Sequence, residues 1–289
     1  MITGAAGQVG RCLAGEAALL GHDVLALNAS QWDITDASAG SGIVERGDVV
    51  VNCAAFTAVD AAEADPDGAH AVNAVGAGNV ARTCALAGAR LIHVSTDFVF
   101  SGHFDGAPRP YEIDDPPEPL GVYGRSKLAG ELAVRAELPG AQVVRTAWVY
   151  TGTGRDFVGA IARRIDGDGP IEVVADQIGS PTYVGDLVGA LLQIVGGGVS
   201  APLLHAANAG VASRFEQARA VFVALGADPG RVRPVSTDRY PRKAPRPSYS
   251  ALSSRLSAAA GLTPLRPWRD ALAEALAGLA GLSGPSGAG

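Results

Sequence analysis

The sequence predicts an α/β fold in which a doubly wound parallel sheet carries a smaller second lobe. Three observations indicate it. Short, nearly continuous apolar runs alternate with helical patterns in the first half of the chain, a glycine-spaced loop opens the first helix, and the alternation weakens after Trp148. Strands that helices cover on both faces read as apolar runs, and such alternation produces a right-handed parallel sheet.

The first strand is expected to be a stub. A strand that leads into a glycine loop lies at the sheet centre, here between residues 23–28 and 48–53, and normally needs about five residues. Only Met1 to Thr3 precede the loop. We expect backbone groups near Val24 and Val49 to lack partners, and the natural chain to start several residues earlier; the intact mass of the protein from its native cell would test this.

The loop Thr3-Gly4-Ala5-Ala6-Gly7-Gln8-Val9-Gly10 has glycines at intervals of three residues. A sharp turn needs glycine where φ is positive, and a pyrophosphate needs bare backbone at a helix N-terminus. Because the loop opens an amphipathic helix that is followed by a second strand, it predicts a dinucleotide site in a Rossmann-like fold. A tight turn in an alanine- and glycine-rich chain is the structural alternative.

The second strand ends at the position that distinguishes NAD from NADP. An acidic residue there favours NAD and an arginine favours NADP, but this chain has Asn28, which enforces neither. Arg11, beside Gly10, inclines the site towards NADP. Asp33 is a candidate adenine contact, with a surface or helix-capping role as an open alternative.

The remaining elements follow in order. The first helix ends at Gly21, and a second begins at Asp65-Pro66 and ends near Gly88. Ser213 and Glu216 have the spacing of a capping box that opens a helix, and the proline-rich stretch 239–250 reads as an extended segment. Apolar runs predict strands at residues 23–28, 48–53, 90–95, 142–148 and 171–176.

These elements divide the chain into unequal parts. We expect an NAD(P)-binding domain over residues 1–150 and a lobe over 151–280 that mainly binds substrate and returns some elements to the sheet. The low-complexity residues 281–289 are expected to be a disordered tail.

Composition narrows the classes of partner. The net charge of -6 and the lack of a Lys/Arg-dense run argue against nucleic acid and anionic lipid. Cys12, Cys53 and Cys84 lack disulfide or zinc spacing. No apolar run approaches the roughly 20 residues of a membrane span, and the start lacks a signal-peptide pattern. We expect a cytoplasmic protein, either a monomer or a homodimer.

Tyr123 and Lys127 lie four residues apart, one helical turn on the same face. An ammonium beside a phenol favours the phenolate, which brings the pKa of tyrosine towards the working range of a proton relay. Lys127 can also hydrogen-bond a nicotinamide ribose. Thr96 ends the strand at 90–95, at the sheet edge where such folds bind ligands, and can hydrogen-bond a substrate carbonyl.

These motifs resemble the extended branch of the short-chain dehydrogenase/reductase superfamily. Its sugar-nucleotide dehydratases carry Thr-Asp-Glu at the strand end, whereas this chain has Phe98 in the third position, which cannot exchange protons. The closer resemblance is to the dTDP-4-dehydrorhamnose reductase family, which completes dTDP-L-rhamnose synthesis. "TGAAGQVG", "HVSTDFVF", "VYGRSKLAGE", "RTAWVY", "DQIGSPTY" and "RPSYSAL" occur in that family's order.

The resemblance implies roles for particular residues. Thr96, Tyr123 and Lys127 would be catalytic, and Asp97 and Trp148 would contact the sugar nucleotide. The expected cofactor contacts are Gly4, Gly7, Gln8, Val9, Gly10, Asn28, Asp33, Ile34, Ala55, Phe56, Thr57, Tyr123 and Lys127. NADPH is the expected cofactor, with NADH also accepted; Mg²⁺ is used by some relatives, but the five histidines show no ligand spacing and no metal site is placed.

Several assignments have structural alternatives. Trp148 could be core packing, and Asp176-Gln177 could be simple turn chemistry. Arg246 could supply charge for a diphosphate or stand idle at the surface. The expected reaction is reduction of the C4 ketone of dTDP-4-dehydro-L-rhamnose. A nucleotide-sugar epimerase, another sugar-nucleotide reductase, or a non-catalytic NADP-binding regulatory subunit are the alternatives.

Overall fold

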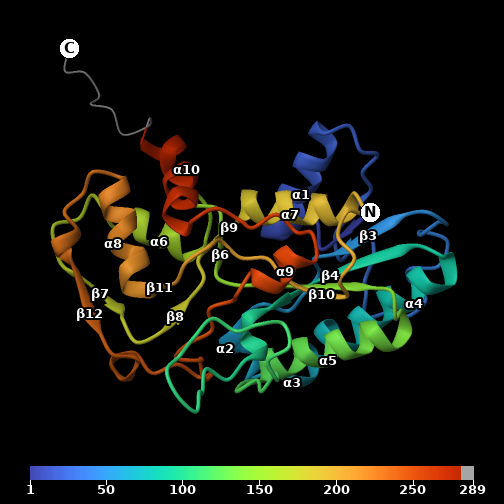
Figure 1. Ribbon diagram of the computed structural model, residues 1–289, viewed down its shortest axis with the longest axis horizontal. Coiled ribbons are helices and arrows are strands. Elements are labelled where there is room, and N and C mark those ends of the chain that lie inside the picture. The colour runs from blue at the N-terminus through green and yellow to red at the C-terminus, as the bar shows by residue number, and fades with distance from the viewer. Residues whose placement is uncertain (281–289) are drawn as a thin grey trace.

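The computed structural model describes residues 1–280, and the predicted tail at 281–289 lies outside the described residues (Figure 1). Its main sheet has six parallel strands in the order β10-β5-β4-β3-β1-β2. This confirms the predicted doubly wound sheet, with β1 between β2 and β3. The strands are β1 (Ile2–Thr3), β2 (Ala26–Leu27), β3 (Val49–Asn52), β4 (Arg90–Thr96), β5 (Gln142–Thr146) and β10 (Leu203–His205).

Helices cover both faces of this sheet (Figure 1). Successive strand residues point to opposite faces. Val50 and Leu91 therefore pack with the core on one side, while Val51 and Ile92 pack with the core on the other. The helices on one face are α1 (Gln8–Leu19) and α7 (Val184–Val195), and those on the other are α3 (Pro66–His70), α4 (Ala77–Ala87) and α5 (Val122–Glu137).

The helix predicted from Asp65 to Gly88 has the expected ends but a different middle. The Asp65 carboxylate accepts a hydrogen bond from the Gly68 N–H, and Gly88 has a φ of 71°. Between α3 and α4, residues Ala71–Gly76 form a π-helical turn, η1. Such turns occur often at functional sites, and this one places the Asn73 side chain against the loop at Phe56.

The strand ends differ from the prediction for two reasons. β2 pairs only with β1, so it can be no longer than that two-residue stub. β5 stops at Thr146 because Trp148 has a φ of 46°, which no strand accommodates. The expected gap at Val49 is wrong: its carbonyl oxygen accepts a hydrogen bond of 2.8 Å from the Met1 amine.

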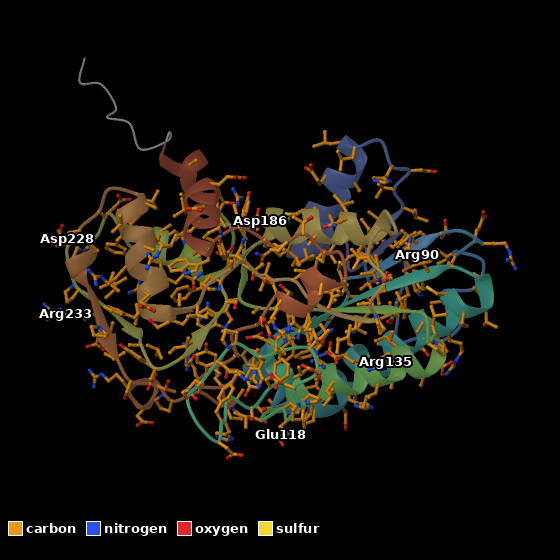
Figure 2. The ribbon with its side chains drawn as sticks, viewed as in Figure 1. Arg90, Glu118, Arg135, Asp186, Asp228 and Arg233 are labelled. Carbon is orange, nitrogen blue, oxygen red and sulfur yellow. The ribbon has the colours of Figure 1, made fainter. Side chains whose placement is uncertain are left out.

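The second lobe contains three two-stranded sheets. Figure 2 shows Asp228 and Arg233 at its outer end, opposite Arg90 on the main sheet. The predicted capping box of Ser213 and Glu216 is confirmed at the start of α8 (Arg214–Ala224). The pairs are β6 (Val149–Tyr150) with β9 (Thr182–Tyr183), β7 (Ile171–Val174) with β12 (Val232–Val235), and β8 (Ile178–Gly179) with β11 (Ala212–Ser213).

The lobe and the main sheet share parts of the chain. β10 comes from the second half but joins the main sheet, and α7 packs on one face of that sheet. The stretch predicted to be extended, 239–250, begins in the 3₁₀ turn Thr237–Arg239 and then contains bends and one isolated bridge, between Tyr249 and Ile178; the Ser248 carbonyl accepts from the Ile178 N–H. Within residues 1–280, no helix is long and apolar enough to cross a membrane. The remaining helices are α2 (Val59–Ala62), α6 (Phe157–Ala162), α8 (Arg214–Ala224), α9 (Arg255–Ala259) and α10 (Trp268–Ala280).

Candidate active site

A cavity of about 790 Å³ lies at the carboxyl ends of β1, β3, β4 and β5, between the main sheet and the lobe. Parallel sheets of this type bind ligands at this edge. Every residue that the sequence assigned to cofactor, catalysis or substrate lines it. These residues are Gly4, Gly7, Gln8, Val9, Gly10, Asn28, Asp33, Ile34, Ala55, Phe56, Thr57, Thr96, Asp97, Tyr123, Lys127, Trp148 and Arg246.

Neighbouring backbone atoms leave no room for a side chain at two glycines of the loop. Gly4 has a φ of 63°, and a Cβ atom there would lie 2.6 Å from the backbone of Ala54. A Cβ atom on Gly10 would lie 2.5 Å from the Gly4 carbonyl oxygen. Gly7 precedes α1 without a side-chain cap, so the first N–H groups of the helix face the cavity as an anion site.

The end of β2 forms one wall of the cavity. The Asn28 side-chain oxygen accepts hydrogen bonds from the N–H and hydroxyl of Ser30. Asp33 similarly accepts from Thr35, so it stabilises a turn as well as lining the cavity. Arg11 is exposed and is not part of the lining, so the structure does not support its expected influence on cofactor choice.

Hydrogen bonds with the Asn73 side chain hold the loop at residues 55–57. The Asn73 amide accepts from the Phe56 N–H at 2.8 Å and donates to the Phe56 carbonyl at 3.0 Å. It also donates to the Ser126 hydroxyl on α5 at 2.9 Å. The π-helical turn therefore connects the cofactor side of the cavity to the helix that carries Tyr123 and Lys127.

Tyr123 lies in the first turn of α5, next to the end of β4. Gly124 allows this contact, because a Cβ atom there would overlap the Phe98 carbonyl oxygen. Burial raises the pKa of Tyr123 to about 12, against the lowering effect of the nearby Thr96 hydroxyl; the nearby Asp97 also raises it. The tyrosine is therefore a neutral phenol at neutral pH.

Asp97 is buried behind Thr96. Its carboxylate accepts hydrogen bonds from the Ser250 hydroxyl at 2.6 Å and the Thr96 hydroxyl at 3.1 Å. Burial raises the pKa of Asp97 to about 6, although these hydrogen bonds and the charge of Arg214 oppose the rise. Ser250 belongs to the "RPSYSAL" stretch, so that segment and Thr96 meet at the Asp97 carboxylate.

Lys127 is also buried, and its surroundings differ from those predicted. Its Nζ donates to the Val94 carbonyl oxygen at 2.8 Å and lies 3.5 Å from the Nε2 of His93. Burial lowers the pKa of Lys127 to about 8, while Glu131 and Cys53 raise it. The expected lowering of the tyrosine pKa by this ammonium is not seen, because the lysine points to β4 and burial dominates at Tyr123.

Trp148 faces the lobe side of the cavity, and it is covered by Arg214, a residue that the sequence patterns did not single out. The Arg214 guanidinium lies 3.5 Å from the centroid of the indole ring. Gly179, in "DQIGSPTY", makes room for this ring, since a Cβ atom there would overlap it. Arg214 also lines the cavity. Only its place in the capping-box helix was visible in the sequence.

The three remaining candidate site residues, Arg246, Asp176 and Gln177, make contacts within the protein. Arg246 lines the cavity, but both its terminal nitrogens donate to Asp60, at 2.9 and 3.1 Å. Asp176 and Gln177 hydrogen-bond to Thr237 and do not line the cavity, which agrees with the turn interpretation. Among residues 1–280, no group of three or more His, Cys, Asp or Glu side chains is arranged to hold a metal ion.

The fold and this cavity define an NAD(P)-dependent oxidoreductase of the short-chain dehydrogenase/reductase class. A glycine loop, a strand-end threonine and a Tyr/Lys pair converge on one cavity at the carboxyl edge of a parallel sheet. The chain belongs to the family described as RmlD substrate binding domain, whose sequence model matches residues 1–280.

Individual relatives narrow the class further. The chain is 64% identical to the dTDP-4-dehydrorhamnose reductase of Mycolicibacterium smegmatis, over 96% of this chain and 84% of the relative. It is 63% identical to the enzyme of that name from Mycobacterium tuberculosis, over 96% and 92%. The solved dTDP-4-dehydrorhamnose reductase of Bacillus anthracis in complex with NADP matches with a TM-score of 0.89 and 36% identity, covering 96% of this chain and 98% of that one.

Proposed function

We propose that this protein reduces the C4 ketone of dTDP-4-dehydro-L-rhamnose to give dTDP-L-rhamnose, with NADPH as cofactor and NADH also accepted. The observation that carries the proposal is the convergence of Thr96, Tyr123 and Lys127 on one cavity that the glycine loop also lines. The near-complete match to relatives that carry the name dTDP-4-dehydrorhamnose reductase supports the same reaction.

The glycine loop and the loop at residues 55–57 would hold the dinucleotide. The tight approach of Gly4 and Gly10 to neighbouring backbone, and the uncapped start of α1, fit a pyrophosphate. When bound, the nicotinamide supplies the hydride. The proton transfer is assigned to side chains of the protein that line the cavity.

Tyr123 acts as the general acid. Its raised pKa keeps the phenol protonated, which a proton donor to a developing C4 oxyanion requires. The Thr96 hydroxyl lines the same cavity and would orient the same oxygen, in a buried site where hydrogen bonds are strong. Lys127 lines the same cavity one helical turn away, where it would hydrogen-bond the nicotinamide ribose.

The substrate sugar would pack between the sheet edge and the lobe over residues 151–280. Trp148, whose ring packs against Arg214, and Asp97, with its buried carboxyl, line the cavity on that side. Arg214 is better placed than Arg246 to meet the diphosphate, because Asp60 already occupies the Arg246 guanidinium. The Arg214 guanidinium makes one hydrogen bond within residues 1–280, to the Gln217 side chain at 3.3 Å.

An assay separates this function from its alternatives. With dTDP-4-dehydro-L-rhamnose supplied, a reductase consumes NADPH in a 1:1 ratio to product, read as loss of absorbance at 340 nm. An epimerase converts its sugar without net consumption, and a regulatory subunit binds NADP without turnover. Cofactor binding with no decay of absorbance would contradict the proposed function.

Arg214→Gln is expected to raise the KM for the sugar nucleotide by roughly 10- to 100-fold, since a hydrogen bond to a charged group contributes about 1.5–3 kcal/mol. The dissociation constant of NADPH should change little. Arg219→Gln, on the exposed face of the same helix, is the matched control. Equal KM values in the two variants would place the diphosphate elsewhere.

Asn28→Asp is expected to shift the preference from NADPH towards NADH. A carboxylate at the end of β2 repels a 2′-phosphate and accepts a hydrogen bond from a ribose hydroxyl. The ratio of kcat/KM for the two cofactors measures the shift. An unchanged ratio would show that Asn28, although it lines the cavity, is not at the ribose.

A further inference from the structure

A chain of buried polar groups lies beneath Lys127. It begins at the Ala54 N–H, which donates to the side-chain oxygen of Asn52 at 3.1 Å; the Thr3 hydroxyl donates to the same oxygen at 2.7 Å. Because a backbone N–H can only donate, it fixes which end of the Asn52 amide is oxygen. The amide nitrogen then faces the Nδ1 atom of His93 at 3.1 Å.

This amide determines the tautomer of His93. The Asn52 nitrogen donates, so Nδ1 must accept, and a neutral ring then carries its proton on Nε2. His93 is fully buried. Burial and the charge of Lys127 lower its pKa well below the usual range, so the ring is neutral. Its Nε2 lies 3.5 Å from the Nζ of Lys127.

We propose that His93 is a positioning residue that presents its Nε2–H to the Lys127 nitrogen and so favours the neutral amine over the ammonium. A neutral amine has a lone pair that accepts this N–H, whereas an ammonium has none. The Val94 carbonyl oxygen accepts from either form. Asn52 and His93 thus act on the catalytic lysine from the side away from substrate.

Other groups around Lys127 act in the opposite direction. Glu131, one turn further along α5, and the Cys53 thiol on the β3 side both raise the lysine pKa. The Glu131 carboxylate is paired with Arg145 at 2.7 Å, which limits its effect on the lysine. The His93 N–H therefore sets the balance that lets Lys127 release and regain a proton near neutral pH. This consequence for turnover depends on the proposed function.

The lysine content makes a direct test practical, because Lys127 and Lys243 are the only lysines in the sequence. In the NADPH-bound protein labelled with ¹³C-lysine, two ε-carbon signals are expected, with the exposed Lys243 as internal reference. Lys127 should titrate below Lys243. Imidazole nitrogen shifts should show His93, assigned by its loss in His93→Gln, as the neutral Nε2–H tautomer.

Asn52→Asp is expected to reverse the direction of the hydrogen bonds that run from residue 52 through His93 to Lys127. A carboxylate cannot donate, so His93 must place its proton on Nδ1, and the bare Nε2 then accepts from the Lys127 ammonium. We expect the His93 tautomer to change and Lys127 to titrate about one pH unit higher. A wild-type ring protonated on Nδ1, or an unmoved Lys127 beside a ring that has changed tautomer, would overturn the proposal.

His93→Gln serves as a second variant if Asn52→Asp does not fold. Its amide can turn the carbonyl oxygen to the ammonium, so Lys127 should again titrate higher, and an unmoved signal contradicts the proposal. The double variant Asn52→Asp/His93→Gln, compared with His93→Gln alone, measures how far the new carboxylate shifts the Lys127 titration directly. Subtracting that shift from the one that Asn52→Asp causes alone leaves the part that the His93 ring transmits. In active enzyme, the alkaline limb of kcat should move upward by the same amount, with KM unchanged. The NMR titration does not require turnover, so its failure is distinct from failure of the proposed function.

Discussion

Tyr123→Phe is expected to lower kcat by at least about 10²-fold, the usual contribution of a general acid. The ring remains, including its edge contact with Phe98 at a centroid distance of 5.6 Å, so the cavity keeps its shape. Only the phenol hydroxyl is lost. The dissociation constant of NADPH should stay close to that of the wild type.

Steady-state turnover and cofactor fluorescence titration measure the two quantities. Tyr150→Phe is a matched control, because Tyr150 is buried and outside the cavity lining, and its hydroxyl has no hydrogen-bond partner among the described residues. That variant should keep its activity. If Tyr123→Phe also turned over at a near-normal rate, another group would have to protonate the C4 oxygen.

The sheet was predictable because its signal is local. Apolar residues fill the centres of both segments, Leu91, Ile92 and Val94 in one and Val143 and Val144 in the other, as in strands covered on both faces, and they occur as β4 and β5. The predictions that were wrong concern segments whose structure depends on contacts with residues distant in the sequence. β2 is cut to two residues by the short β1, and the helix from Asp65 is opened into a π turn where Asn73 meets Phe56 and α5.

The site was predictable where chemistry and spacing coincide, as in the glycine loop and the Tyr123/Lys127 pair. Arg214 and His93 were missed for a physical reason. An arginine in a capping-box helix and a histidine in an apolar strand look structural until the fold places one over Trp148 and the other beneath Lys127. The four-residue spacing of Tyr123 and Lys127 also does not show that the lysine side chain points towards the Val94 carbonyl oxygen.

Glu131→Gln is expected to produce the largest loss of stability, about 3–5 kcal/mol in the free energy of unfolding. The Glu131 carboxylate accepts from Arg145 at 2.7 and 2.9 Å and from the Ser95 hydroxyl at 2.5 Å, and both partners of the ion pair are almost fully buried. An amide in its place leaves the Arg145 charge buried without a counter-charge. Chemical denaturation followed by circular dichroism measures the loss.

The same substitution on the same helix provides the control. Glu137 pairs with Arg82 at the surface, where solvent screens the pair, so Glu137→Gln should leave the unfolding midpoint almost unchanged. Adding Arg145→Met to Glu131→Gln should recover part of the loss, because the uncompensated charge is then gone. Comparable losses in the two single variants would mean that the buried pair does not support the fold. Since Glu131 also raises the pKa of Lys127, Glu131→Gln should lower the pH at which that lysine titrates, so a single buried carboxylate links the stability of α5 to the charge of Lys127.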